Sequence, residues 1–338
     1  MNSSSHLQIP NGFANLEQDI GYIVGPQGFI YCLDLASGET QAISEIPATP
    51  LMIDQDTLIG WASESSDPKT IKLFGANRKG DDLRVTWEKP LELPDWVEVD
   101  SPEADSLSIV AQVEGDKSVI TWEAHSRYKG GAPPPAYVER AAIQDVRHEI
   151  QLDPETGDEI SSTQMEIASS SVETLPQVGP TRRIVPYQIG NKWETQPWRS
   201  GSASQWLVRG IDYPGIILVR QEDGADEALE IRLTKDPDAV ASVTPDGNYI
   251  FVQEPGGKAP MWLVFSATGE RVAQLPYEAG VESVSVVNGR ALYVVTEMDE
   301  RIRRRTLHCR DLQTAEALWS FKLSEERPKA PPTLRPRM

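Results

Sequence analysis

The sequence predicts an all-β protein, a single β-propeller built from four-stranded blades. Short apolar strands recur along the chain at steps near the length of a propeller blade, about 40–45 residues. A turn that combines Asp, Ser or Thr, and Gly follows most of these strands. The chain also holds 26 prolines and 24 glycines, which suit short strands and turns better than helices.

The recurring strand is a short apolar run entered from a turn, and it begins at Tyr22, Leu58, Leu107, Ile216, Tyr249 and Ala291. Successive starts lie 36, 49, 109, 33 and 42 residues apart, so four of the five steps are near one blade. The long step fits two steps of about 54 residues or three of about 36. It contains an insertion, so we prefer two steps and a count of seven blades. Six or eight blades stay open.

The recurring turn has the form Asp-x-x-(Ser/Thr)-Gly. Asp34–Gly38 and Asp153–Gly157 match it fully, Phe265–Gly269 lacks the Asp, Asp311–Ala315 lacks the Gly, and Ala76–Gly80 is a weaker copy. Asp ends a strand by accepting hydrogen bonds from nearby backbone amides, and Gly supplies the positive φ of a tight turn. Each turn is therefore expected to close a hairpin within a blade.

These segments resemble known propeller repeats. Residues 21–38 and 307–319 resemble the quinoprotein-type (PQQ-like) repeat, and residues 243–252 resemble the SPDGxxIxF repeat of WD40-like and TolB-type propellers. Dehydrogenases of the quinoprotein family are larger, carry a secretion signal and often have adjacent cysteines near the cofactor. The resemblance therefore implies the fold and not the cofactor, and we expect neither a quinone nor a metal to be bound.

The expected organisation is an N-terminal segment (1–19), the propeller (20–326) and a basic, proline-rich tail (327–338) that is mobile. Residues 125–204 break the rhythm and are expected to form an irregular insertion. Within it, apolar residues near helical spacing predict a short helix over residues 136–146.

The formal charge of −19 disfavours nucleic-acid binding, because an acidic surface repels phosphates. No secretion signal or membrane-spanning segment is recognised, so a cytoplasmic location is expected. Cys32 and Cys309 precede Gly38 and Ala315 by six residues each and hold the same place in two repeats. Such positions in packed sheets lie about 10 Å apart, beyond the roughly 7 Å that a disulfide spans. Two buried, free thiols are expected.

No catalytic, cofactor or metal site is predicted. His6, His125, His148 and His308 show no metal-ligand spacing, and the chain has neither a GxSxG elbow nor a phosphate-binding loop. Carboxylates are abundant, but one sequence cannot pair them across blades.

The leading hypothesis is therefore a non-enzymatic scaffold, or a subunit of a larger assembly, that binds other proteins. The expected partner-binding residues are Arg182, Arg183, Trp193, Trp198, Arg303, Arg304, Arg305, Arg335 and Arg337, because Trp and Arg are over-represented at interfaces. A plainer interpretation is that the aromatics cover the core and the arginines neutralise nearby acids. Two further alternatives are an enzyme or ligand binder using the central funnel, and an envelope factor for inserting outer-membrane proteins, which would need a secretion signal.

Overall fold

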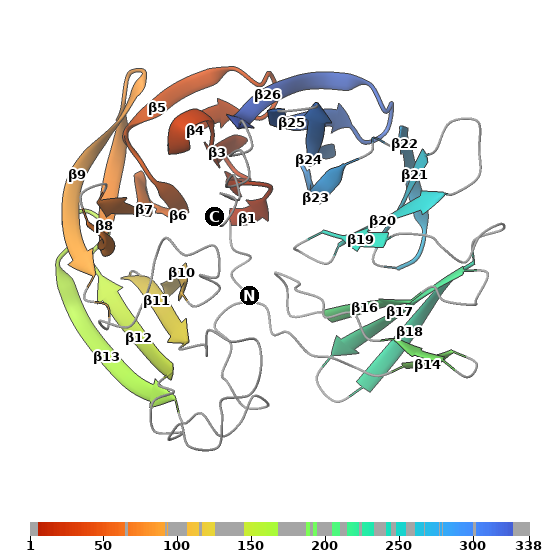
Figure 1. Cartoon of the computed structure of the whole chain (residues 1–338), viewed down its shortest axis with the longest axis horizontal. Coiled ribbons are helices and arrows are strands. Elements are labelled where there is room, and N and C mark those ends of the chain that lie inside the picture. The colour runs from red at the N-terminus through yellow and green to blue at the C-terminus, as the bar shows by residue number, and fades with distance from the viewer. Residues whose placement is uncertain are drawn as a thin grey trace, which may run out of the picture.

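The computed structural model is a β-propeller whose sheets are arranged around a central axis (Figure 1). The described residues form strands and one short 3-10 helix, and they contain no α-helix. The structure describes residues 6–64, 67–91, 93, 107–114, 117–125, 145–167, 187–189, 192–194, 205–209, 215–222, 225–232, 241–244, 248–254, 261–266, 268–276, 278, 280–299 and 302–326.

Three blades come from the first half of the chain, and neighbouring strands within each blade pair antiparallel. The first holds η1 (Pro26–Gly28) and four strands, β2 (Gly12–Asn15), β3 (Ile20–Val24), β4 (Phe29–Asp34) and β5 (Thr40–Pro47). An additional strand, β1 (His6–Ile9), pairs with β2, and the strands of this blade are counted from β2. The second holds β6 (Thr49–Asp54), β7 (Thr57–Glu64), β8 (Asp67–Lys79) and β9 (Asp82–Leu91). The third holds β10 (Leu107–Glu114), β11 (Lys117–His125), β12 (Asp145–Leu152) and β13 (Glu159–Ile167).

A two-stranded sheet and three more blades follow. The small sheet holds β14 (Tyr187–Ile189) and β15 (Lys192–Glu194). The fourth blade holds β16 (Gln205–Arg209), β17 (Gly215–Glu222) and β18 (Ala225–Arg232). The fifth holds β19 (Ala241–Val243), β20 (Tyr249–Glu254), β21 (Met261–Ser266) and β22 (Arg271–Pro276). The sixth holds β23 (Val281–Val287), β24 (Arg290–Asp299), β25 (Ile302–Asp311) and β26 (Ala317–Glu326).

The all-β propeller prediction is confirmed. The described strands make six blades, one of the counts left open, rather than the preferred seven. The difference arises in the long step after Leu107, which contains the rest of the third blade and the β14–β15 sheet but no further blade among the described strands. Part of the length of this step arises because Leu107 begins a first strand, β10, whereas the other five recognised units lie in second strands.

Two boundaries also differ from the sequence expectations. Strand β1 pairs with β2, and β2 pairs with β3, so the sheet of the first blade begins at His6 and not at residue 20. Part of the expected insertion over 125–204 is blade structure, because β12 and β13 complete the third blade. Residues 145 and 146 of the expected helix begin β12, where they pair with β11 instead. Residues 136–144 and the expected mobile tail lie outside the described residues.

The core consists of separate apolar layers between adjacent blades. In β3, Tyr22 packs in the layer shared with the second blade, and the next residue, Ile23, packs in the layer shared with the sixth. Successive strand residues point to opposite faces, so a central strand that is covered on both sides is apolar at every position. This packing accounts for the weak polar–apolar alternation of the sequence.

The recurring turns join the third and fourth strands of their blades. Asp34 Oδ1 accepts the backbone N–H groups of Ala36 and Ser37 at 2.9 and 2.8 Å, and Gly38 has a φ of 76°. Asp153 and Asp311 form the same bonds in the third and sixth blades. The turn of the fifth blade is one residue shorter, and there Ser266 Oγ accepts the Glu270 amide at 3.2 Å.

Tryptophans of the fourth strands connect a blade to the turn of the next. Trp319 of β26 donates its indole Nε1–H to the Leu35 carbonyl at 2.9 Å, and Trp87 of β9 donates to the Pro154 carbonyl at 3.0 Å. Each carbonyl belongs to the residue that follows the Asp of the turn. Gly38 brings the backbone close to the ring of Trp319, since an added Cβ would lie 2.5 Å from its Cγ.

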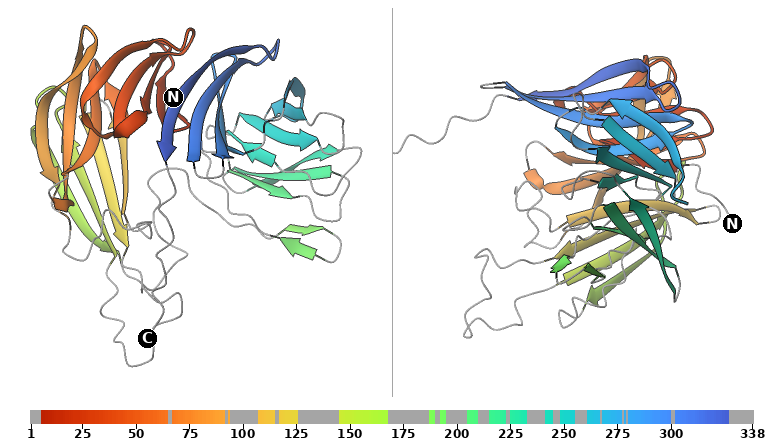
Figure 2. Two further views of the ribbon diagram at one scale, coloured as in Figure 1. Left: turned by 45° about the horizontal axis from the view of Figure 1, so that its top comes forward. Right: turned by 90° about the vertical axis from the view of Figure 1, so that its right-hand side faces the viewer.

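The ring closes by packing of the first blade on the sixth, which lie side by side in Figure 2. Ile23 and Leu33 share one apolar layer with Leu292 and Leu307. At the edge of this layer, Asp19 accepts two hydrogen bonds from Arg290 at 2.8 and 2.7 Å and one from Asn288. The described ring is therefore closed by contacts between side chains. No described strand from one end of the chain joins the blade at the other end.

Cys32 and Cys309 are both buried and unpaired. Cys309 lies in the layer between the sixth and first blades, whereas Cys32 lies in the layer between the first and second. The sheet of the first blade separates these layers, because equivalent positions in successive blades face the same way around the ring. Burial raises the pKa of the Cys32 thiol to about 11 and that of Cys309 to about 12.

Two glycine substitutions test the packing of Trp319 against the Asp34–Gly38 turn. Gly38 and Gly80 both have positive φ, but a Cβ at Gly80 meets nothing within 4 Å. Gly80→Ala should cost only the left-handed conformation, about 1 kcal/mol. Gly38→Ala adds the clash with Trp319 and should cost about 3 kcal/mol or more. Urea unfolding of both variants checks this, and equal costs would contradict the docking geometry.

The Asp19–Arg290 pair should make ring closure sensitive to acid. The hydrogen bonds from Arg290 lower the pKa of Asp19 below its ordinary value of 3.8. The stabilisation is therefore present above pH 4 and is lost as pH falls through the lowered pKa. Asp19→Asn should lower the free energy of unfolding by about 1–2 kcal/mol at pH 7 and by less at pH 3. Asp82→Asn, which breaks an exposed pair with Arg84, should cost under about 0.5 kcal/mol at both pH values.

Candidate functional site

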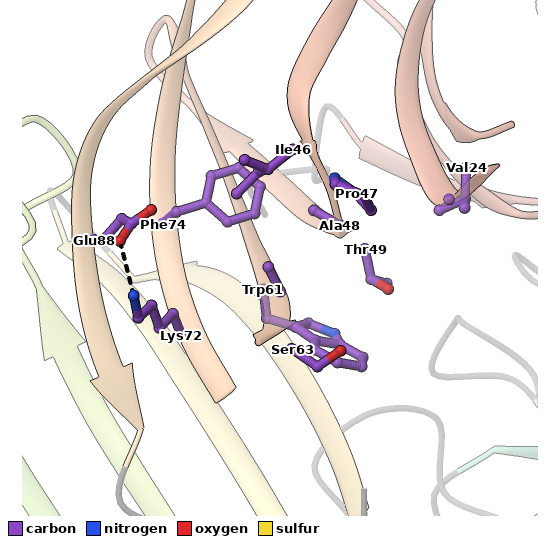
Figure 3. A pocket seen from close by; sticks show the side chains of 12 residues that line it. Val24, Ile46, Pro47, Ala48, Thr49, Trp61, Ser63, Lys72, Phe74 and Glu88 are labelled. Carbon is purple, nitrogen blue, oxygen red and sulfur yellow. Dashed lines mark hydrogen bonds and ion pairs between the residues drawn. The ribbon is translucent and has the colours of Figure 1, made fainter. Parts of the chain in front are cut away.

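A groove opens between the first and second blades, where two outer strands separate. β5 and β9 pair in parallel through Ile43 with Asp82 and Ser44 with Leu83. Towards their ends the strands border a cavity of about 710 Å³, called the inter-blade groove below (Figure 3). Its lining comprises Val24, Gly28, Ile46, Pro47, Ala48, Thr49, Trp61, Ala62, Ser63, Lys72, Phe74 and Glu88. This volume is typical of binding pockets, which span about 300–1,000 Å³.

The groove is mostly apolar. Ile46 comes from the end of β5, Ala48 from the connection between β5 and β6, and Phe74 from β8 (Figure 3). Trp61 and Ser63 project from the end of β7 on the same side of the strand, because they are two residues apart. Trp61 is half-buried because part of its ring packs against the apolar layer between the second and third blades, and Ser63 is exposed. A ligand can therefore reach Ser63 and the uncovered part of the Trp61 ring.

One ion pair stands at the outer end of the groove. Lys72 Nζ lies 3.3 Å from Glu88 Oε2, and their side chains are 32% and 43% exposed. The two charges neutralise each other, and the remaining side-chain hydrogen-bonding groups of the lining are the hydroxyls of Thr49 and Ser63 and the indole N–H of Trp61. This arrangement suits binding of an apolar segment with a few polar contacts, because it offers neither a paired nucleophile and base nor two free carboxylates.

The groove lies at the face of the ring where the second and fourth strands of each blade end. Its residues come from the ends of β3, β5 and β7 and from near the end of β9. β11, β13 and β26 are also second or fourth strands of their blades. Their last residues therefore lie at this same face, and they are His125, Ile167 and Glu326. The described ends of these three strands therefore lie on the side of the groove.

The structure places few of the expected partner-binding residues. Arg182, Arg183, Trp198, Arg335 and Arg337 lie outside the described residues. The backbone of Trp193 belongs to β15, where it pairs with Gln188.

Arg303, Arg304 and Arg305 follow one another on β25 and do not line the groove. Arg303 is exposed. Arg304 Nε lies 3.8 Å from Glu325 Oε2, and Arg305 donates a hydrogen bond to Asn11 Oδ1 at 3.1 Å. Arg304 is thus partly neutralised within its own blade, and Arg305 connects the sixth blade to the first.

A fourth arginine of this strand, Arg310, is also used inside the blade. It donates hydrogen bonds to Tyr293 Oη at 2.7 Å and to Glu278 Oε1 at 2.9 Å. Tyr293 donates to the same carboxylate oxygen at 2.7 Å. The plainer interpretation of the arginine cluster, in which acids neutralise it, therefore describes Arg304 and Arg310.

The sequence interpretation missed Trp61 and Phe74. A signal was present, since Trp61 ends the strand unit that begins at Leu58. A large aromatic residue at a strand end, followed by polar residues, favours an exposed position at the face of a ring. Nothing in the sequence indicated that the β5–β6 connection would form the opposite wall.

Comparisons with known proteins assign no family to this chain. No protein-family model and no curated protein matches the sequence, so the quinoprotein-type resemblance is not confirmed. Similar solved structures include BamB from Moraxella catarrhalis, with 13% identity, 82% of this chain and 78% of that chain covered, and a TM-score of 0.33. The WD40 domain of SCAP from fission yeast has 10% identity, coverages of 96% and 88%, and a TM-score of 0.37. The Dos1 propeller has 10% identity, coverages of 92% and 67%, and a TM-score of 0.26. These neighbours are propellers, and similarity at this level carries no information on function.

The described part of the chain contains neither a metal-binding cluster nor a membrane-spanning helix. No cluster of three or more His, Cys, Asp or Glu residues is placed to hold a metal ion among the described residues. In the same part of the chain, no helix has the length and apolar character needed to cross a membrane.

Proposed function

We propose that this chain is a non-enzymatic β-propeller that binds another protein, as a scaffold or as a subunit of a larger assembly. The observation that carries the proposal is the inter-blade groove, an open and largely apolar site with the half-buried Trp61 in its lining. Tryptophan side chains in such positions dominate the binding energy of many protein interfaces.

The groove is suited to a protein segment because its walls are held in place before binding. Phe74 and Ala48 are buried in the layers of the ring, so their positions are fixed by packing. A preformed apolar site loses little conformational entropy when a ligand enters. The exposed Ser63 and the Lys72–Glu88 pair supply polar contacts at the edge, as the rim of an interface does.

The proposed surface also includes residues of the sequence that follow β13 and β26. They are Arg182, Arg183, Trp193 and Trp198 after the third blade, and Arg335 and Arg337 after β26. We include them in the partner-binding surface, together with the exposed Arg303 of the last blade. The proposal also includes the expected cytoplasmic location.

The alternative is an enzyme or small-ligand binder that uses the central funnel. A buried serine–aspartate pair is present, in which Ser118 Oγ donates to Asp54 Oδ2 at 2.7 Å. Both side chains are buried, and they connect the third blade to the second. A nucleophile must be accessible and must face a base that can take its proton. This pair therefore has a structural role and gives the alternative no support.

Partner capture from native cells tests the proposal. The tagged chain, after mild crosslinking, should retain a defined partner that mass spectrometry identifies. Trp61→Ala should reduce its capture at least tenfold, because a hot-spot tryptophan contributes about 2 kcal/mol or more. Ser63→Arg should do the same by filling the groove at an exposed position, where it leaves the fold intact.

Ser161→Arg is the matched control, because Ser161 is exposed on β13 of the third blade and far from the groove lining. It should capture the partner like the unmodified chain, and melting temperatures should confirm that all variants are folded. A partner that is retained equally by the Trp61 and Ser63 variants would refute the groove as the binding site.

A further inference from the structure

We infer that the inter-blade groove is also the docking site of the chain's own C-terminal tail, residues 327–338. The tail would then occupy the groove in the absence of a partner and compete with it. The regulatory consequence rests on the proposed function, whereas binding of the tail to the groove does not and can be measured on the purified protein alone.

The composition of the tail matches the chemistry of the groove. The tail contains four prolines, four basic residues and no acid, and its first part, Pro328-Lys-Ala-Pro331, has the spacing PxxP. Proline-rich segments adopt the polyproline II conformation and bind grooves lined by aromatic side chains, because little conformational entropy remains to be lost. The groove offers the half-buried Trp61 for such contacts, supported from beneath by the buried Phe74.

The charges are complementary as well. The whole chain carries a net charge of −19 although the tail itself is basic, so the ring is strongly acidic. Within the groove Glu88 is paired with Lys72, so the attraction comes from the acidic chain as a whole and not from the lining. The attraction is a surface effect and should weaken with salt, since the Debye length falls from about 10 Å at 0.1 M to about 3 Å at 1 M.

The place where the tail begins brings it within reach. Phe321 of β26 packs on Tyr31 of the first blade, with ring centroids 5.1 Å apart. Tyr31 belongs to β4, which directly follows η1, and Gly28 of η1 lines the groove. β26 thus passes beside the first blade, next to the element that forms one edge of the groove.

The length of the tail is sufficient. Strand β26 ends at Glu326, five residues after Phe321 and therefore at most about 17 Å further along the strand. Twelve residues of polyproline II span about 37 Å. Glu326 also ends at the groove face, so the tail can turn back over η1 without passing through the ring. Because the tail is tethered, its effective concentration at the groove is of the order of millimolar.

A fluorescent peptide with the sequence of residues 327–338 tests the inference by anisotropy. The receptor is the full chain in which Pro328, Pro331, Pro332 and Pro336 are all changed to Gly, which keeps every tail charge but removes the polyproline II preference. We expect this receptor to bind the peptide at least tenfold more tightly than the unmodified chain, whose own tail occupies the groove.

Three variants of this receptor define the site. Trp61→Ala and Ser63→Arg should each lower the peptide affinity at least tenfold, and Ser161→Arg should leave it unchanged. A peptide with the same four Pro→Gly changes should bind the receptor at least tenfold more weakly. Equal binding by the unmodified chain, equal binding of the glycine peptide, or indifference to Trp61 and Ser63 would each overturn the inference.

The partner experiment separates the two proposals. If the tail occupies the groove, the four Pro→Gly changes in the full chain should raise partner capture. If the peptide fails to bind while capture still depends on Trp61, the tail inference fails and the proposed function stands. If the peptide binds as expected and capture does not depend on Trp61, the proposed function fails and tail docking stands.

Discussion

The contact between the first and sixth blades is the constraint on which the rest of this structure depends. No described strand crosses that seam, so side chains from opposite ends of the chain must hold it. Trp319 and Leu35 are 284 residues apart, and Arg290 and Asp19 are 271 residues apart. Ordering so long a loop costs entropy, which the apolar layer at the seam and its hydrogen-bonded edge must offset. Strands β1 and β2 contribute to this layer through Ile9 and Ala14, so the N-terminal residues are part of the ring.

The elements that sequence reasoning placed correctly are those that depend on local chemistry. The turns at Asp34, Asp153 and Asp311 are specified within five residues, because one carboxylate bonds the next amides and one position takes positive φ. The strand units are equally local, and five of six were assigned to equivalent strands. Leu107 was assigned to the wrong strand of its blade because β10 and β11 are both apolar and adjacent. The spacing of the strand units along the chain could not distinguish β10 from β11.

The groove could not be predicted in the same way, because it arises from how two blades diverge. Its lining comes from six segments spread between Val24 and Glu88, and no segment is unusual by itself. The arginines of β25 show the opposite problem. Their clustering is evident in the sequence, yet the groups that use them are remote or on another strand: Asn11 for Arg305, and Glu278 for Arg310. Composition predicted an interaction surface there, and the fold uses part of it for its own closure.

The seam between the first and sixth blades and the inter-blade groove lie on opposite sides of the first blade. Closure of the ring is therefore coupled to binding in the groove. The first blade contributes Tyr22, Cys32 and Ile30 to the layer beneath the groove and Ile23, Leu33 and Leu35 to the seam. Gly25, just before η1, lies so close to Tyr31 and Phe321 that an added Cβ would be 2.5 and 3.1 Å from their rings. Any ligand that contacts both walls of the groove therefore binds best when the first blade is held in place by the sixth. Since a ligand that prefers the closed ring stabilises it by mass action, occupation of the groove should also protect the seam. Binding in the groove and closure of the ring therefore stabilise each other. The tail follows β26, the last strand at the seam, so docking of the tail would contribute to both.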